Sequence, residues 1–261
     1  MIKVGVLGAK GRMGSLVCQT VRSAGDLELA AGVDVGDSRD ALRGCDVVVD
    51  FTSPAAVMEN LAWCVGSGLN TVIGTSGFDG ARLAEAADIV AGATGTNGAA
   101  GASKPRVLVV PNFSVGAVLM MTFAARAARF FESAEIVELH HAGKIDAPSG
   151  TSARTAALIA AARSAAGLGH GPDATATQLD GARGAVVDGV HVHSVRLAGL
   201  VAHQEVLLGG HGETLTIRHD SLDRASFMPG VLAAVRGIAS LPPGLTVGLD
   251  SLLGLALPGV G

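Results

Sequence analysis

The first third of the chain alternates apolar runs with segments of helical period. Residues 2–7, IKVGVL, have the character of a buried parallel strand, and a glycine-rich turn separates them from a helix expected over 12–24. Further strands are expected at 27–33, 46–51, 70–73 and 106–110, with helices between them from the third strand onward. Residues 91–103 are rich in small residues and are expected to be a mobile surface loop without an assigned function. The alternation predicts an α/β fold with a Rossmann-like, doubly wound parallel sheet.

The pattern changes after residue 112. Helices are expected over 115–131 and 152–166, with an apolar strand between them at 134–139. Polar and apolar residues then alternate through 191–197, 201–208 and 213–219, as in half-buried antiparallel strands. These elements predict a second, α+β domain with a mostly antiparallel sheet. A last helix over 223–239 and the apolar tail after Pro243 could return to the first domain.

Composition and charge exclude several kinds of partner. The chain has 261 residues, 49% of them apolar, which suffices for sizeable cores. A net charge of −4 with 19 Lys and Arg residues argues against nucleic-acid binding. No apolar span of about 20 residues occurs and the N-terminus lacks signal-peptide features, so we expect neither membrane insertion nor export. Cys18, Cys45 and Cys64 lie in apolar runs without CxxC spacing, which favours reduced thiols and a cytoplasmic location.

The turn after the first strand has the residues of a dinucleotide site. Gly8, Gly11 and Gly14 allow the backbone to turn tightly and approach a pyrophosphate, which the following helix N-terminus stabilises. The spacing is GxxGxxG rather than GxGxxG, and such a triplet alone also fits an ordinary tight turn. Asp34, at the end of the second strand, is placed to accept hydrogen bonds from the adenosine ribose, with a solvated turn residue as the alternative.

The charges near Asp34 bear on the choice of cofactor. An acid at this position favours NADH. Lys10 in the glycine turn and Arg39 beyond Asp34 are cations that could compensate the 2′-phosphate of NADPH. We therefore predict that both NADH and NADPH are used.

A second constellation occupies residues 138–151, ELHHAGKIDAPSGT. The apolar strand delivers His140 and His141 to its end, and successive strand side chains point to opposite faces, so the two imidazoles are expected to have different roles. Lys144 follows in a short loop, and Ser149 begins a helix whose N–H groups can hold a carboxylate. Each residue taken singly also has an ordinary structural explanation. Together they suit binding of a small dianion and transfer of a proton to it.

The order HHxxKxDAPSGT resembles the signature of the dihydrodipicolinate reductases, also called 4-hydroxy-tetrahydrodipicolinate reductases, of bacterial lysine and diaminopimelate synthesis. Other motifs of that family follow in family order: GAKGRMG at 8–14, DFTSP at 50–54, VIGTSGF at 72–78 and PNFSVG at 111–116. The resemblance covers essentially the whole chain. It implies NAD(P)H-dependent reduction of a cyclic, unsaturated imine dicarboxylate to tetrahydrodipicolinate. It also implies a dinucleotide-binding domain over 1–111, to which 221–261 return, and a substrate-binding domain over 112–220 that forms homotetramers.

The resemblance further implies roles for individual residues. His140 is expected to act as general acid/base, Lys144 to donate a proton, and His141 to hydrogen-bond the substrate, with Gly150 and Thr151 holding one carboxylate. Which group delivers the final proton stays open. The residues expected to contact the cofactor are Gly8, Ala9, Lys10, Gly11, Arg12, Met13 and Asp34, then Gly74, Thr75 and Ser76, then Val110, Pro111, Asn112 and Phe113. Ser76 stands where threonine is usual, which keeps the hydroxyl.

Some positions depart from the family pattern or fall outside it. Ala142 and Gly143 stand where relatives often carry a bulkier or polar residue just before the lysine, so a support for Lys144 or the substrate would be missing. His191 and His193 lie two apart on one strand face without a third ligand at suitable spacing, so we expect no metal site. Structural or interface roles are expected for the remaining polar residues of the late strands: Arg196, His203, Glu205, His211 and His219.

The residues alone leave three other functions open. A related NAD(P)H-dependent imine or semialdehyde reductase would use the same fold on another substrate. A nucleotide-sensing module would have the glycine turn without catalytic residues, and a scaffolding protein would need neither. The constellation at 138–151 argues against the last two.

Overall fold

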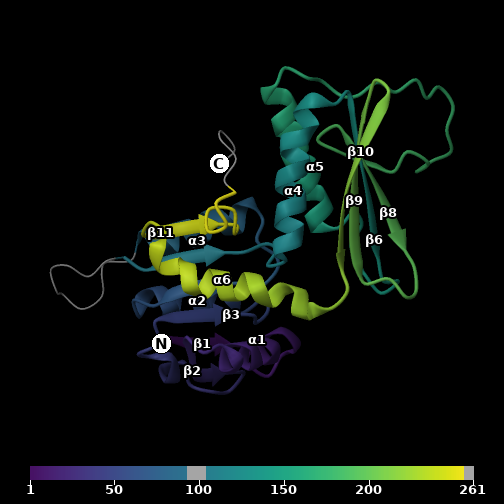
Figure 1. Cartoon of the computed structure of the whole chain (residues 1–261). Coiled ribbons are helices and arrows are strands. Elements are labelled where there is room, and N and C mark those ends of the chain that lie inside the picture. Colours follow the sequence, from purple (N-terminus) through teal and green to yellow (C-terminus); the bar gives the residue numbers. More distant parts are fainter. Residues whose placement is uncertain (93–103, 256–261) are drawn as a thin grey trace. The chain divides into compact units, whose positions relative to one another are not determined.

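The computed structural model describes residues 1–92 and 104–255, so most of the loop expected at 91–103 lies outside the described residues. The described chain divides into two compact units. The first comprises Met1–Phe113 and Phe227–Gly254, and the second comprises Ser114–Ser226 with Leu255. Figure 1 labels the elements of both units.

A parallel sheet forms the centre of the first unit. Within the described residues it has six strands, in the order β11-β5-β4-β3-β1-β2. Every neighbouring pair is parallel. The strands are β1 (Ile2–Leu7), β2 (Leu27–Val33), β3 (Val47–Asp50), β4 (Asn70–Ile73), β5 (Arg106–Val109) and β11 (Gly244–Val247). Because β1 lies between β2 and β3, the strand order reverses there, and the carboxyl ends of these three strands meet where open α/β sheets bind ligands.

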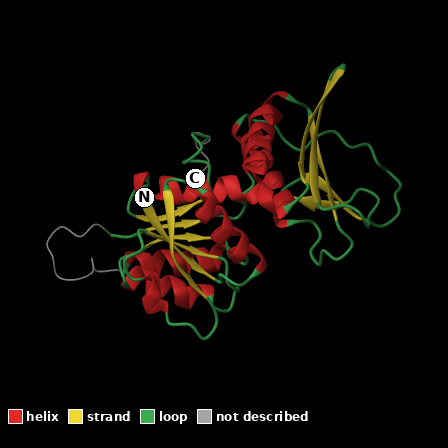
Figure 2. Cartoon of the chain, turned by 60° about the horizontal axis from the view of Figure 1, so that its bottom comes forward, coloured by secondary structure: helices red, strands yellow, loops and turns green. Residues whose placement is uncertain are grey.

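Helices cover both faces of this sheet (Figure 2). They are α1 (Arg12–Ser23), α2 (Val57–Gly66), α3 (Gly80–Ala91) and α6 (Met228–Gly237). Short 3₁₀ turns lie at Arg39–Leu42, Arg224–Phe227 and Ile238–Ser240, so the helix expected over 223–239 is divided into three pieces. Gly230 lets α6 approach the main chain, because a Cβ there would lie 2.0 Å from the carbonyl oxygen of Phe113. The predicted doubly wound α/β fold is confirmed.

The second unit is a mixed sheet with helices on one face. Its helices are α4 (Val115–Ala127) and α5 (Gly150–Ala165), with a 3₁₀ turn at Ala128–Phe130. Its strands are β6 (Ser133–His140), β7 (Ala185–Val187), β8 (Val190–Arg196), β9 (Ala202–Gly210) and β10 (Glu213–Ser221). In the described residues the order is β10-β9-β6-β8-β7, and β6 with β8 is the one parallel pair among them. The predicted mostly antiparallel sheet is therefore confirmed.

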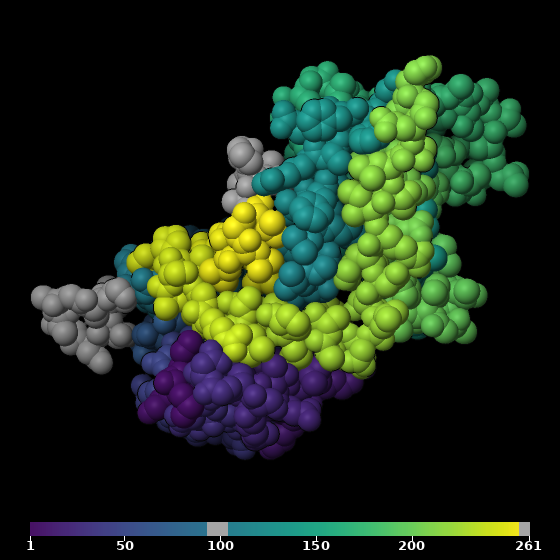
Figure 3. All heavy atoms as spheres, viewed as in Figure 1, coloured from purple at the N-terminus to yellow at the C-terminus, as the bar shows by residue number. Residues whose placement is uncertain are grey.

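The core of this unit lies between the sheet and its helices. Ile136 of β6, Ile159 of α5 and Val206 of β9 are fully buried there. Most of β10 is exposed at the edge of the sheet, as the light green spheres of Figure 3 illustrate. No helix in the described ranges combines the length and the apolar character that a membrane crossing requires.

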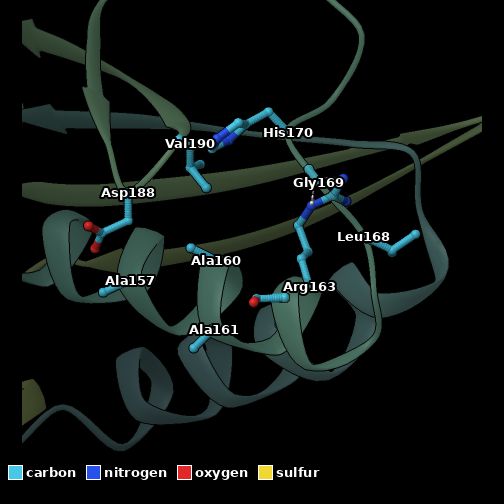
Figure 4. Close-up of a pocket in the computed structure, with 11 residues that line it drawn as sticks. Ala157, Ala160, Ala161, Arg163, Leu168, Gly169, His170, Asp188 and Val190 are labelled. Atoms are coloured by element: carbon cyan, nitrogen blue, oxygen red, sulfur yellow. Dashed lines mark hydrogen bonds between the residues drawn. The ribbon is translucent and has the colours of Figure 1, made fainter.

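A cavity of about 480 Å³ lies beside α5 in the second unit (Figure 4). Arg163 lines it, and the guanidinium donates to the carbonyl oxygens of Ala128, Phe131, Glu132 and Gly169. These bonds tie the turn after α5 to the segment before β6. Because its guanidinium binds only main-chain carbonyls among the described residues, Arg163 has a structural role. None of the residues predicted for catalysis or binding lines this cavity.

Candidate active site

The glycine turn between β1 and α1 is built for close approach of an anion. Gly8 has a φ of +76°, which L side chains rarely adopt. A Cβ on Gly14 would lie 2.0 Å from the carbonyl oxygen of Gly8, so helix and turn are packed main chain against main chain. Gly11 caps α1 without a side-chain hydrogen bond, which leaves the first amides of the helix, at Arg12 and Met13, to a ligand. A pyrophosphate fits this cradle.

A cleft of about 490 Å³ continues from the turn to the end of β2. Asp34 lines it, and the carboxylate accepts hydrogen bonds from the main-chain N–H groups of Lys10 (2.7 Å) and Val35 (2.9 Å). These bonds lower the pKa of Asp34. The carboxylate is therefore charged and fixed at the mouth of the cleft, as a group that receives ribose hydroxyls must be.

The two cations predicted to meet a 2′-phosphate already have acidic partners. Lys10 Nζ lies 3.4 Å from Asp37 Oδ2. Arg39 Nη2 lies 2.5 Å from Glu59 Oε1, and Arg39 and Glu59 both line the cleft. Arg39 therefore lines the cleft itself, whereas Lys10 reaches it through Asp37, which lines it.

Two aromatic rings close the other end of this edge of the sheet. Phe51, after β3, and Phe113, after β5, lie with ring centroids 5.4 Å apart. Both pack over Gly74, where a Cβ would come within 2.3 Å of the Phe51 ring and 2.7 Å of the Phe113 ring. The structure therefore brings Gly74 and Phe113, from two of the loops that the family resemblance assigns to the cofactor, into contact.

Asp50, at the end of β3, is a buried acid that the sequence analysis did not single out. Its carboxylate accepts hydrogen bonds from Thr52 Oγ1 (2.7 Å), Asn60 Nδ2 (3.0 Å) and Thr75 Oγ1 (3.0 Å), and from the N–H of Thr52. It thereby connects the loop after β3 with Thr75 in the loop after β4. The sequence signal for this acid was its position directly after three valines of a buried strand, because a buried charge must be paired.

The second constellation lies at the end of β6, in the second unit. Ile136, Glu138 and His140 share the sheet face that packs on the helices, because side chains alternate along a strand. The parallel register with β8 places Arg196 opposite His140. The histidine therefore comes to lie beside an arginine that is distant in sequence.

Glu138 is fully buried and carries the polar contacts of this end of the strand. Its carboxylate accepts from both Nη atoms of Arg196 (2.8 Å each), from His140 Nδ1 (2.5 Å) and from the main-chain N–H of Ser149 (3.3 Å). Burial raises the pKa of Glu138, but hydrogen bonds from Arg196, Ser194 and His140 outweigh it and leave the pKa below its ordinary value. Burial also lowers the pKa of His140, against the opposing effect of Glu138.

Lys144 and the start of α5 complete this constellation. Lys144 Nζ lies 2.6 Å from Asp146 Oδ1, and its side chain is 19% exposed. Ser149 caps α5 by accepting a hydrogen bond from the N–H of Ser152. The first two residues of the helix, between these two serines, are Gly150 and Thr151. β6 ends at His140, so His141 lies one residue beyond the strand, where it is exposed.

Other histidines of the second unit have structural partners. His193 Nε2 lies 2.7 Å from Glu135 Oε2, and His191 Nδ1 donates to the carbonyl oxygen of Arg183. Arg183 also binds Glu135, on the sheet face opposite Glu138. Across residues 1–92 and 104–255, no group of three or more His, Cys, Asp or Glu side chains is arranged to hold a metal ion.

The fold and the two constellations define an NAD(P)-dependent oxidoreductase of the two-domain α/β kind. Family models described as dihydrodipicolinate reductase, N-terminus, and dihydrodipicolinate reductase, C-terminus, match residues 2–97 and 116–253. The chain therefore belongs to the dihydrodipicolinate reductase family, whose members use NADH or NADPH.

Relatives support this assignment over the full length. The chain is 62% identical to a 4-hydroxy-tetrahydrodipicolinate reductase of Cutibacterium acnes, over 98% of this chain and 100% of the relative. It is also 62% identical to the enzyme of the same name from Thermobifida fusca, with the same coverage. Among solved structures, a dipicolinate-bound dihydrodipicolinate reductase from Paenisporosarcina sp. TG-14 superposes with a TM-score of 0.80 at 37% identity, over 96% of this chain and 99% of that one.

Proposed function

We propose that this protein is a 4-hydroxy-tetrahydrodipicolinate reductase, which reduces a cyclic, unsaturated imine dicarboxylate to tetrahydrodipicolinate in lysine and diaminopimelate synthesis. The observation that carries the proposal is the convergence of His140, Lys144 and the first amides of α5 at one end of β6. A cation, an imidazole and a helix N-terminus match a doubly charged ring. The identity of 62% to named reductases over the full length supports the same reaction.

Residues of the second unit would bind the substrate and transfer protons. The amides of Gly150 and Thr151 hold one substrate carboxylate, and His141 hydrogen-bonds the substrate from the exposed end of the strand. Lys144, an ammonium paired with Asp146, donates the proton that the reduced ring takes up. Because burial lowers the pKa of His140, we assign its neutral ring to taking up a proton from water and returning it to Lys144 after the lysine has protonated the reduced ring.

The cofactor groups of the first unit complete the reaction. Bound NADH or NADPH supplies the hydride. The glycine turn, with Ala9 at its centre, would hold the pyrophosphate, and Asp34 would hold the adenosine ribose. Thr75 and the exposed Ser76, with Asn112 and Pro111, would line the nicotinamide end.

The reaction is tested by NADH consumption with the freshly formed condensation product of pyruvate and aspartate semialdehyde. Lys144→Ala should remove most turnover while leaving NADH binding nearly intact. Lys3→Ala, at an exposed position on β1, is the matched control and should keep full activity. Unchanged turnover in Lys144→Ala would refute the role of the lysine.

A related imine or semialdehyde reductase is the second candidate, since it would share the fold. Substrate competition separates the two. The proposed reaction predicts competitive inhibition by pyridine-2,6-dicarboxylate, the planar dicarboxylate present in the solved Paenisporosarcina enzyme. No inhibition, with good activity on a monocarboxylate imine, would favour the second candidate.

We further propose use of both cofactors. Asp34 suits the free ribose of NADH, while Lys10 and Arg39 beside the same cleft suit a 2′-phosphate. Steady-state kinetics with each cofactor tests this. A preference for one of them of more than about a hundredfold, or roughly 2.7 kcal/mol, would contradict dual use.

Assembly and location complete the proposal. Leu207 of β9 is 38% exposed on the sheet face away from the helices, and Val201 before β9 is 40% exposed. Such apolar positions on an open sheet support a homotetramer formed through the second unit. The buried free thiols of Cys18, Cys45 and Cys64 support a cytoplasmic location. Light scattering coupled to size exclusion measures the mass directly, and a monomer at assay concentration would contradict the assembly.

A further inference from the structure

We propose that Glu138 is a positioning residue that fixes the tautomer and orientation of His140 and ties this ring to the loop of Lys144. The inference deepens the proposed function, because its catalytic consequence rests on His140 acting in that reaction. Its structural core, the state of the imidazole, stands on contacts alone.

The contact between Glu138 and His140 determines which ring nitrogen carries the proton. Glu138 Oε2 lies 2.5 Å from His140 Nδ1. The other contacts of this carboxylate are with donors: both Nη atoms of Arg196 and the N–H of Ser149. A carboxylate so surrounded is ionised and can only accept. His140 must therefore donate from Nδ1, and Nε2 is left as the nitrogen that exchanges protons with a substrate.

The surroundings of Glu138 hold its carboxylate in place. Glu138 has no exposed surface, and the strands on either side place Ser194 of β8 and Gln204 of β9 directly opposite it. Gln204 is fixed in turn by Ser152 and Thr155 of α5, at 2.8 Å each. The acceptor for His140 thus sits in a buried polar layer whose members are hydrogen-bonded to one another.

Glu138 and Arg196 connect His140 to the other residues of the candidate site. Arg196 Nη2 donates both to Glu138 Oε1 (2.8 Å) and to the carbonyl oxygen of Asp146 (2.6 Å), whose side chain pairs with Lys144. The same Glu138 oxygen accepts the N–H of Ser149, at the start of α5. The Glu138 carboxylate therefore contacts the His140 ring and the start of α5 directly, and reaches the Lys144 loop through Arg196.

The charges that face His140 determine what loss of Glu138 would do. Glu138 on its own strand favours the protonated ring, whereas Arg196 of β8 and Lys144 of the following loop disfavour it. From β9, Ala202 lies opposite His140, and His203 lies opposite Leu139 on the other face. Lys144 is itself paired with the Asp146 carboxylate. Without Glu138 the ring loses both its fixed tautomer and the group that favours its protonation, while Arg196 and Lys144 remain.

The chain offers a matched control on the other face of the same strand. Glu135 accepts from His193 Nε2 (2.7 Å) and from Arg183 Nη2 (2.6 Å), which repeats the glutamate, histidine and arginine arrangement away from the candidate site. Glu135→Gln removes a partly buried carboxylate of the same kind. It should leave turnover unchanged.

The experiment compares the full-length wild type, Glu138→Gln and Glu135→Gln. Nitrogen NMR of histidine-labelled protein, assigned with His140→Gln, reports which nitrogen of His140 is protonated and how the ring titrates. NADH titration by fluorescence checks the first unit, and kcat and KM are measured against pH. If Glu138→Gln does not fold, Glu138→Gln with Arg196→Met replaces the whole pair with neutral groups, which buried cores tolerate better than an orphaned charge.

We expect wild-type His140 to be a single Nδ1–H tautomer and Glu138→Gln, or the double variant, to show mixed tautomers with a lower titration midpoint. In the same variant kcat should fall by at least about tenfold with NADH affinity unchanged, because loss of an orienting carboxylate costs an imidazole more than this in known triads. An Nε2–H tautomer in the wild type, or an unchanged His140 signal in the folded variant, overturns the proposal. Altered tautomers in an enzyme inactive on the imine would instead sustain the positioning and refute the proposed reaction.

Discussion

Replacement of Arg196 by methionine tests how the buried carboxylate of Glu138 is stabilised. Arg196→Met keeps a long side chain but removes two hydrogen bonds of 2.8 Å to a carboxylate with no exposed surface. Breaking a buried ion pair from one side costs about 3–5 kcal/mol, because the remaining charge is left uncompensated. We expect a destabilisation of about this size at neutral pH.

The pH dependence of this loss has a definite sign. In the wild type the pKa of Glu138 is below its ordinary value, so its contribution to stability is present above the unfolded pKa and is lost as pH falls through the folded one. Removal of Arg196 takes away the largest effect that opposes burial, so the pKa rises. Glu138 then takes up a proton at higher pH, and its uncompensated charge disappears. The difference between wild type and variant should therefore shrink between about pH 7 and about pH 4.

The assay is urea unfolding followed by circular dichroism at several pH values. Arg218→Met is the control, because Arg218 pairs with Glu205 and Asp220 on the same sheet but is 46% exposed. Water screens an exposed pair, so this variant should stay close to the wild type throughout. A loss in Arg196→Met that is independent of pH, or that grows towards acid, would refute the reasoning.

Two further predictions concern the cofactor cleft. Gly14→Ala places a Cβ 2.0 Å from the Gly8 carbonyl oxygen, so α1 must move away from the turn and NADH affinity should fall by at least about tenfold. The control is Gly25→Ala, whose Cβ meets no atom within 4 Å and which should bind NADH like the wild type. Equal NADH affinities for both variants would show that the pyrophosphate does not bind at this turn. Asp37→Asn releases Lys10 from an exposed pair worth up to about 1 kcal/mol, so binding of NADPH should strengthen relative to binding of NADH by up to about fivefold. A shift in favour of NADH would contradict a role for Lys10 at the 2′-phosphate.

The first unit could be predicted from its sequence because its signals are local. Apolar runs at 2–7, 27–33 and 70–73 coincide with β1, β2 and β4, since a buried parallel strand needs little more than a continuous run of suitable residues. β11 was expected only as an apolar tail. It spans four residues, Gly244–Val247, and becomes a strand because β5 offers it an edge. Such an edge is a property of the assembled sheet.

The second unit required information that no local pattern holds. Alternation predicted β8, β9 and β10, but not that β6 pairs parallel with β8. That pairing brings Arg196 beside His140, so an arginine expected to be structural or interfacial lies next to a predicted catalytic residue. β7 was not predicted at all, because its three residues carry no alternation and are mostly exposed.

A buried acid is the point at which sequence reasoning could have gone further. Glu138 lies between Val137 and Leu139 in an apolar strand and shares a face with Ile136, so the pattern alone places a carboxylate towards the core. Burial of that charge requires a cation and further donors. The sequence therefore predicts that Glu138 has hydrogen-bond partners, and His140, two residues along the same face, is one of them. Which of the 19 lysines and arginines supplies the rest is decided by strand register. That register places Arg196 on Glu138, and the carboxylate held in this way is the acceptor that fixes the tautomer of His140.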